Sequence, residues 1–127
     1  MFSNFEYENI GVPRNPNNPF YSLPASLNPD GFAFVDLGLG PIVSDAGENG
    51  KFRVPTLRNI AETGPYMHNG VFNTLAEVID FYNNRNPDDA EVTQNVTNND
   101  VGNLGLNLQQ RQDLEAFLRT LSDGFIQ

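Results

Sequence analysis

The segment that decides the fold is GKFRVPTLRNIAETGPYMHNGVFNTLAEVIDFYN, residues 50–83. It contains His68, the only histidine of the chain, directly after Met67 and upstream of Tyr82. Imidazole, thioether and phenol groups all coordinate iron in proteins, and here the three fall within sixteen residues. The segment therefore predicts a turn and a helix that together cover one face of a metal cofactor.

A helix is predicted from Thr74 to about Asn83. In the sequence T-L-A-E the Thr74 hydroxyl can accept a backbone N–H while the Glu77 carboxylate reaches back, which is a capping box. Apolar and aromatic residues then recur three and four positions apart and share one face: Leu75, Val78, Ile79 and Tyr82. Tyr82 is therefore expected to point with the core-facing residues.

A shorter helix is predicted upstream, in LRNIAE at residues 57–62, with Pro55 or Thr56 near its start and Gly64-Pro65 at its end. A final helix is predicted over residues 107–124, because Asn107 can cap it and Gly124 can end it. Its apolar stripe is Leu114, Phe117, Leu118 and Leu121.

The rest of the chain lacks helical periodicity. Residues 1–50 are rich in Asn, Pro and Gly, which favours successive turns and extended pieces, with disorder as the alternative. Apolar residues in this half are expected to attach the loops to a core or a cofactor: Phe2, Phe5, Ile10, Phe20, Phe32, Phe34 and Val35. Residues 85–106 are predicted to form a long surface loop.

Composition limits the function. At 127 residues the chain is one domain or part of one. Its 7 Lys and Arg residues against 16 Asp and Glu, a net charge of -9, argue against a nucleic-acid partner. No apolar run approaches the roughly 20 residues of a membrane span, and residues 1–13 lack the features of a secretory signal. The absence of cysteine excludes disulfides, thiolate metal sites and thiolate catalysis within this chain.

Three segments carry a resemblance to a known family. Residues 51–84, residues 2–20 (FSNFEYENIGVPRNPNNPF) and residues 113–124 (DLEAFLRTLSDG) resemble the C-terminal haem domain of bacterial di-haem cytochrome c peroxidases and their MauG-like relatives. The resemblance implies part of a mainly α, cytochrome c-like haem domain with few short helices and long Asn/Pro/Gly-rich loops. Residues 1–50 would form a loop-rich cover, 51–84 the haem-facing turn and helix, 85–106 a surface loop and 107–124 the C-terminal helix.

The resemblance also implies a function. The family reduces hydrogen peroxide and transfers electrons through haem in the bacterial periplasm, with an electron-donor or substrate protein as partner. This chain would supply the distal face of the six-coordinate haem. The family attaches haem c through Cys-x-x-Cys-His, shortly before the segment that matches Phe2 to Pro13, and that motif is absent here.

The missing motif leaves three hypotheses. In the first, the chain is a segment that is inactive alone and depends on a haem-bearing preceding segment or companion chain. In the second, it is a haem-free interaction module derived from this domain, with the haem space filled by side chains such as Phe32, Phe34, Phe72 and Phe81. In the third, His68 and Tyr82 act together as a non-covalent haem or metal binder.

The resemblance implies a role for individual site residues. Tyr82 stands where one group of members has a methionine and MauG-like members have a tyrosine as distal iron ligand. His68 is expected near the haem edge or propionates, Arg58 beside a propionate, and Met67 as packing in the same turn. Calcium is expected on the carbonyl oxygens of Thr63 and Pro65, since Ca²⁺ prefers oxygen ligands.

Overall fold

The computed structural model describes residues 3–97 and 101–124. In this part of the chain the α-helices are α1 (Leu39–Val43), α2 (Leu75–Asn84) and α3 (Leu108–Arg119). Single 3-10 turns are η1 (Pro19–Ser22), η2 (Gly31–Ala33), η3 (Ala46–Glu48), η4 (Ile60–Glu62) and η5 (Pro87–Asp89). Most of the remainder is loop, so the prediction of a mainly α fold is correct only in part.

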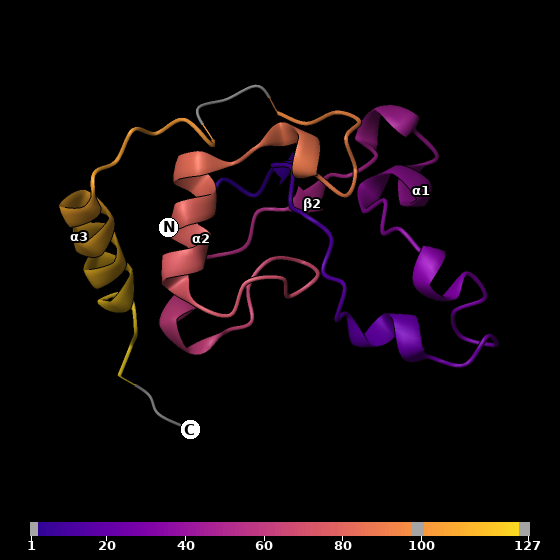
Figure 1. The fold of residues 1–127 in the computed structure, drawn as a ribbon, viewed down its shortest axis with the longest axis horizontal. Coiled ribbons are helices and arrows are strands. Elements are labelled where there is room, and N and C mark those ends of the chain that lie inside the picture. The colour runs from indigo at the N-terminus through magenta and orange to yellow at the C-terminus, as the bar shows by residue number, and fades with distance from the viewer. Residues whose placement is uncertain (1–2, 98–100, 125–127) are drawn as a thin grey trace.

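The elements are arranged in two groups (Figure 1). Helices α2 and α3 lie side by side at one end, and the turns η1 and η2 lie together at the other, in the N-terminal third. Between them, strands β1 (Tyr7–Glu8) and β2 (Phe52–Arg53) pair antiparallel, with Tyr7 opposite Arg53. Within residues 3–97 and 101–124, none of the helices has the length and apolar character of a membrane span.

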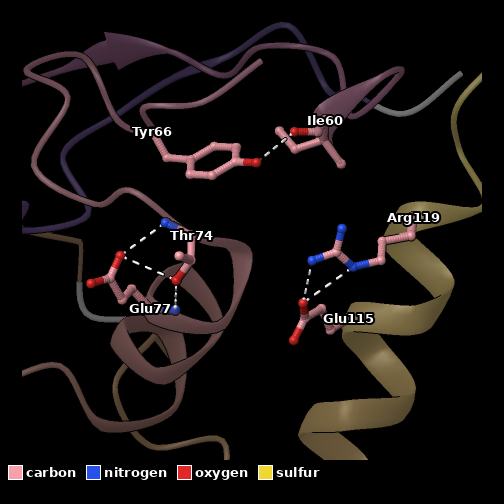
Figure 2. Close-up of polar contacts among 6 residues, drawn as sticks. All are labelled: Ile60, Tyr66, Thr74, Glu77, Glu115 and Arg119. Carbon is pink, nitrogen blue, oxygen red and sulfur yellow. Dashed lines mark hydrogen bonds and ion pairs between the residues drawn. The ribbon is translucent and has the colours of Figure 1, made fainter. Parts of the chain in front are cut away.

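Helix α2 begins at the predicted capping box. The Glu77 N–H donates to Thr74 Oγ1 at 3.2 Å, and the Thr74 N–H donates to the Glu77 carboxylate at 2.9 Å (Figure 2). Hydrogen bonds from the N–H groups of Asn73 and Thr74 lower the pKa of Glu77. Leu75 and Ile79 are buried at 2% and 4% exposure, so the predicted apolar face is confirmed at these positions.

The other two predicted helices are shorter than expected. LRNIAE forms only the 3-10 turn η4, because Asn59 takes a left-handed conformation at φ 56° and its N–H donates to the Leu121 carbonyl oxygen at 3.1 Å. Helix α3 ends at Arg119 rather than near residue 124, with Arg119 paired to Glu115 at 2.7 Å in the last turns (Figure 2). Of its predicted stripe, Phe117 is 51% exposed.

Residues 85–106 are more than the predicted surface loop, although residues 98–100 lie outside the described part. Ala90 is buried, and the Glu91 N–H donates to the Val12 carbonyl oxygen at 3.0 Å. The buried Asn9 amide donates to the carbonyl oxygens of Val92 and Gln94 at 3.0 and 2.7 Å. Residues 90–94 of this segment are therefore tied to the N-terminal third.

The apolar core of the described residues is small. Its buried members are Val12, Tyr66, Leu75, Ile79 and Ala90. Many larger apolar side chains are exposed instead, among them Phe5, Leu27, Phe32, Ile42, Leu108 and Phe117. Phe2, which was expected to attach a loop, lies outside the described residues. Burial of apolar surface is the main stabilising term in folding. With so small a core, hydrogen bonds between loops contribute an unusually large share of the stability.

One such bond gives a direct test of stability. Asn83 is buried, donates to the Leu106 carbonyl oxygen at 3.1 Å and accepts from the Leu106 N–H at 2.8 Å. Asn83→Ala leaves both groups of Leu106 unpaired, so we expect it to lower the free energy of unfolding by about 1–3 kcal/mol more than Asn84→Ala. Asn84 is the matched control because it is exposed on the same helix. Chemical denaturation measures both, and equal losses would contradict the assignment.

Candidate functional site

Tyr82 lies in the last part of helix α2 and is half-buried. Its ring meets Phe81 edge-on at 5.7 Å between centroids, and burial raises the pKa of its phenol above the usual 10.0. Its hydroxyl has no hydrogen-bond partner among residues 3–97 and 101–124. Its backbone is fixed, since the carbonyl oxygen accepts from the Gly102 N–H at 2.7 Å. The phenol is therefore held in place while its oxygen is left without a partner in the described chain.

His68 lies in a tight turn whose ends are pinned together. The Tyr66 N–H donates to the Phe72 carbonyl oxygen at 2.7 Å, and the Tyr66 hydroxyl donates to the Ile60 carbonyl oxygen at 2.9 Å (Figure 2). Within the turn, Met67 has a left-handed φ of 70°, and its carbonyl oxygen accepts from the Gly70 N–H at 3.3 Å. These bonds set the position of the imidazole.

The His68 ring stacks on Phe52 of strand β2, with centroids 3.6 Å apart and planes inclined by 10°. His68 is exposed as a whole residue, so the ring face against Phe52 is the part that loses water. This desolvation lowers the pKa of His68 below 6.5, although the nearby Asp36 carboxylate opposes the shift. The neutral imidazole is therefore the favoured form at pH 7.

His68 and Tyr82 are not brought together in one cleft. His68 lines a cleft of about 220 Å³ whose wall does not include Tyr82. A second cleft, of about 310 Å³, lies along helix α2, and its wall includes Phe72 and Phe81. The described residues contain no cluster of three or more His, Cys, Asp or Glu side chains that suits a metal ion.

Of the remaining predicted site residues, all but Met67 are exposed. Arg58 is exposed, and its guanidinium has no hydrogen bond or ion pair within the described residues. Met67 is half-buried. Thr63 and Pro65 are exposed, and neither carbonyl oxygen accepts a hydrogen bond from a described residue. The guanidinium and both carbonyl oxygens are therefore open to groups outside this part of the chain.

Sequence reasoning missed the residues around His68. Phe52 is sixteen positions away in another element, and Asp36 and Glu91 lie in loops with no periodic pattern. No local signal marks these residues, because their proximity to His68 is created by the long-range pairing of β1 with β2 and of residue 13 with residue 90.

The chain is similar to proteins of one family. It is 40% identical to the methylamine utilization protein MauG of Paracoccus denitrificans (strain Pd 1222) over 96% of this chain and 35% of MauG. It is 36% identical to cytochrome-c peroxidase IdrP2 of Denitromonas iodatirespirans over 94% of this chain and 33% of that protein. The chain thus spans about a third of the length of these relatives.

Solved structures show a similarity to the same group of proteins. A MauG-like protein associated with microbial copper homeostasis matches with a TM-score of 0.67 and 32% identity, over 95% of this chain and 33% of that one. The diheme peroxidase BthA of Burkholderia thailandensis E264 matches with a TM-score of 0.60 and 29% identity, over 93% and 33%. No family model matches the chain. On sequence and fold together, the chain belongs to the family of MauG and the di-haem cytochrome c peroxidases.

Proposed function

We propose that this chain is part of the C-terminal haem domain of a MauG-like oxidoreductase and covers the distal side of its six-coordinate haem. The relatives named as MauG and as cytochrome-c peroxidases support the reaction class. They are about three times as long as this chain, so a haem-bearing segment or companion chain is expected to supply the rest of the site. Alone, the chain is expected to have little or no peroxidase activity.

Tyr82 carries the proposal. Tyr82 is half-buried and its phenol oxygen has no partner among the described residues. Burial opposes its ionisation, so a cation beside it would stabilise the phenolate. A haem iron is such a cation, and when bound as a six-coordinate haem it would supply electron storage and relay for the peroxide reaction. Phenolate is a hard anionic donor that favours Fe(III) over Fe(II). The capping box and the buried face of α2 would hold Tyr82 in a fixed orientation.

The donor set fits a haem in part. Tyr82 offers one axial ligand, Arg58 an unpaired guanidinium for a propionate, and the neutral His68 a hydrogen-bonding group near the edge, with Met67 packing in the same turn. No cysteine is present for thioether attachment, so the covalent bonds would come from outside this chain. Localisation in the periplasm, where c-type haem proteins of this family act, and an electron-donor or substrate protein belong to the same proposal.

A calcium ion near Thr63 and Pro65 is a further part of this proposal. The two unbonded carbonyl oxygens suit a hard cation that prefers oxygen ligands. They fill only two of the six to eight coordination positions that are usual for Ca²⁺, so a complete site would need ligands from another segment.

The haem-free interaction module is less well supported. Such a module would bury its aromatic side chains in the space left by haem, since empty cavities are costly. Phe32 is instead 62% exposed, and Phe34, Phe72 and Phe81 are only half-buried. They fall into separate pairs, with Phe34 against Phe20 and Phe72 against Phe81. Partly exposed aromatic pairs favour a surface that covers another group.

Tyr82→Phe tests the proposed ligand in the haem-containing protein. Loss of the phenolate should change the spin state of the haem and raise its reduction potential, on the order of 0.1 V or more. Visible spectroscopy with a redox titration measures both quantities. Tyr7→Phe is the matched control, since Tyr7 is an exposed tyrosine on strand β1. A Tyr82→Phe protein with unaltered spectrum and potential would remove Tyr82 from the site.

His68 gives a prediction of its own, because it is the only histidine and its ring proton gives a single NMR titration. We expect a pKa below 6.5 in the folded chain, moved down further by Asp36→Asn and up by Phe52→Ala. Since the unfolded chain then takes up this proton more readily, the contribution of His68 to the unfolding free energy should fall as pH drops below about 6.5. A folded-state pKa at or above 6.5 would show that stacking does not desolvate the ring.

A further inference from the structure

The cleft beside His68 combines aromatic rings with two carboxylates, and the proposed haem cover gives those carboxylates no role. It measures about 220 Å³ and is walled by three aromatic rings, Phe20, Tyr21 and Phe34, and by the carboxylates of Asp36 and Glu91. Phe20 and Tyr21 belong to turn η1, at the end of the molecule away from helix α3 (Figure 1). Aromatic rings combined with carboxylates are the groups that bind organic cations in proteins.

The chain already holds one of its own cations against this wall. The Arg14 guanidinium carbon lies 4.6 Å from the ring centroids of both Tyr21 and Phe32, and its Nη1 lies 3.8 Å from Glu91 Oε1. Arg14 also donates to the Phe32 carbonyl oxygen. Of these groups Tyr21 and Glu91 also line the cleft, so part of its wall already stabilises a cation.

Glu91 retains an unused acceptor. Its side chain is only 6% exposed, yet both of its described polar contacts, from Arg14 and from the Tyr21 hydroxyl at 3.3 Å, reach Oε1. Oε2 has no hydrogen bond from a described residue. Oε2 is not fully shielded from water, so it remains accessible to a donor, and the cleft that Glu91 lines is the space from which one can approach.

The charge of the cleft has the sign that attracts a cation. The carboxylates of Asp36 and Glu91 stand against a single nearby guanidinium, that of Arg14. The lowered pKa of His68 keeps its ring largely uncharged at pH 7, so the imidazole adds little repulsion. An incoming cation therefore meets one uncompensated negative charge and a wall that includes aromatic rings.

We propose that this cleft binds an alkylammonium group, with Glu91 and Asp36 as charge partners and Phe20, Tyr21 and Phe34 as the aromatic wall. The site goes beyond the haem cover and does not depend on it. Its chemistry suits either a free amine or the lysine side chain of a partner protein, since both present the same cationic group on an alkyl stem.

Isothermal titration of the full chain with butylammonium chloride tests the site, with sodium chloride at equal ionic strength and neutral 1-pentanol, of similar size, as controls. We expect saturable binding of the ammonium only, accompanied by a shift of the His68 ring NMR signals. If binding of butylammonium does not saturate at concentrations up to about 100 mM, the proposal is overturned, because specific sites bind more tightly than that. Equal binding of pentanol would also overturn it.

Two variants localise the binding. Glu91→Gln and Asp36→Asn should each weaken it by about tenfold or more, since each removes a charge partner of the cation. Glu115→Gln is the matched control, because it makes the same change of charge on helix α3. Asp36 is exposed, so Asp36→Asn keeps the test valid even if Glu91→Gln fails to fold. Equal affinities in Asp36→Asn and Glu115→Gln would overturn the assignment.

A third titration separates the two sources of the ammonium group. It uses lysine whose α-amino and α-carboxyl groups are blocked as amides, so that only the side-chain ammonium remains charged. Affinity at least about tenfold above that of butylammonium would assign the site to a protein side chain, whereas equal or weaker binding would assign it to a free amine. Either result supports an ammonium site. Tyr82→Phe should leave all these affinities unchanged, so failure of the haem-cover proposal remains distinguishable from failure of this one.

Discussion

Hydrogen bonds from asparagine side chains to distant backbone groups are the interaction on which the rest of this structure depends. Asn9 joins residues 92 and 94 to the N-terminal third, and Asn83 pairs both backbone groups of Leu106. Asn59 and Asp123 exchange two more bonds, at 3.1 and 2.9 Å, across the start of turn η4. Because few apolar side chains are buried in the described part of the chain, these hydrogen bonds join distant segments as strand pairing does in a sheet.

The loops fixed in this way position the candidate site. Segment 9–13 lies against residues 90–92, and this brings Glu91 to the wall beside His68. The pairing of β1 with β2 holds Phe52 where the His68 ring stacks on it. Helix α2, which begins at its own capping box, carries Tyr82. His68 and Tyr82 therefore belong to two differently supported surfaces, which explains why they do not share the cleft.

The sequence predicted structure that depends on residues close together in the chain, and it missed contacts between residues far apart in the chain. Thr74 and Glu77 are three residues apart, so the cap and start of helix α2 could be predicted from pattern alone. The helix predicted in LRNIAE failed because Asn59 turns left-handed to bond the backbone at Leu121, a contact with no trace in the local sequence. The stacking of Phe52 on His68 and the bond from Asn9 to Val92 likewise depend on pairing across the fold. The family, in contrast, was identifiable from motifs such as GPYMHNG, and the relatives confirm it.

In the proposed function, the Tyr82 phenol, which has no partner in the described chain, is the feature that links this fold to haem. The most direct test is resonance Raman spectroscopy of the haem-containing protein, grown with ordinary and with ring-deuterated tyrosine. If Tyr82 binds the iron, tyrosinate bands should be enhanced, should shift with the label and should disappear in Tyr82→Phe. Absence of any band that shifts with the label would contradict the assignment of Tyr82 as the distal ligand.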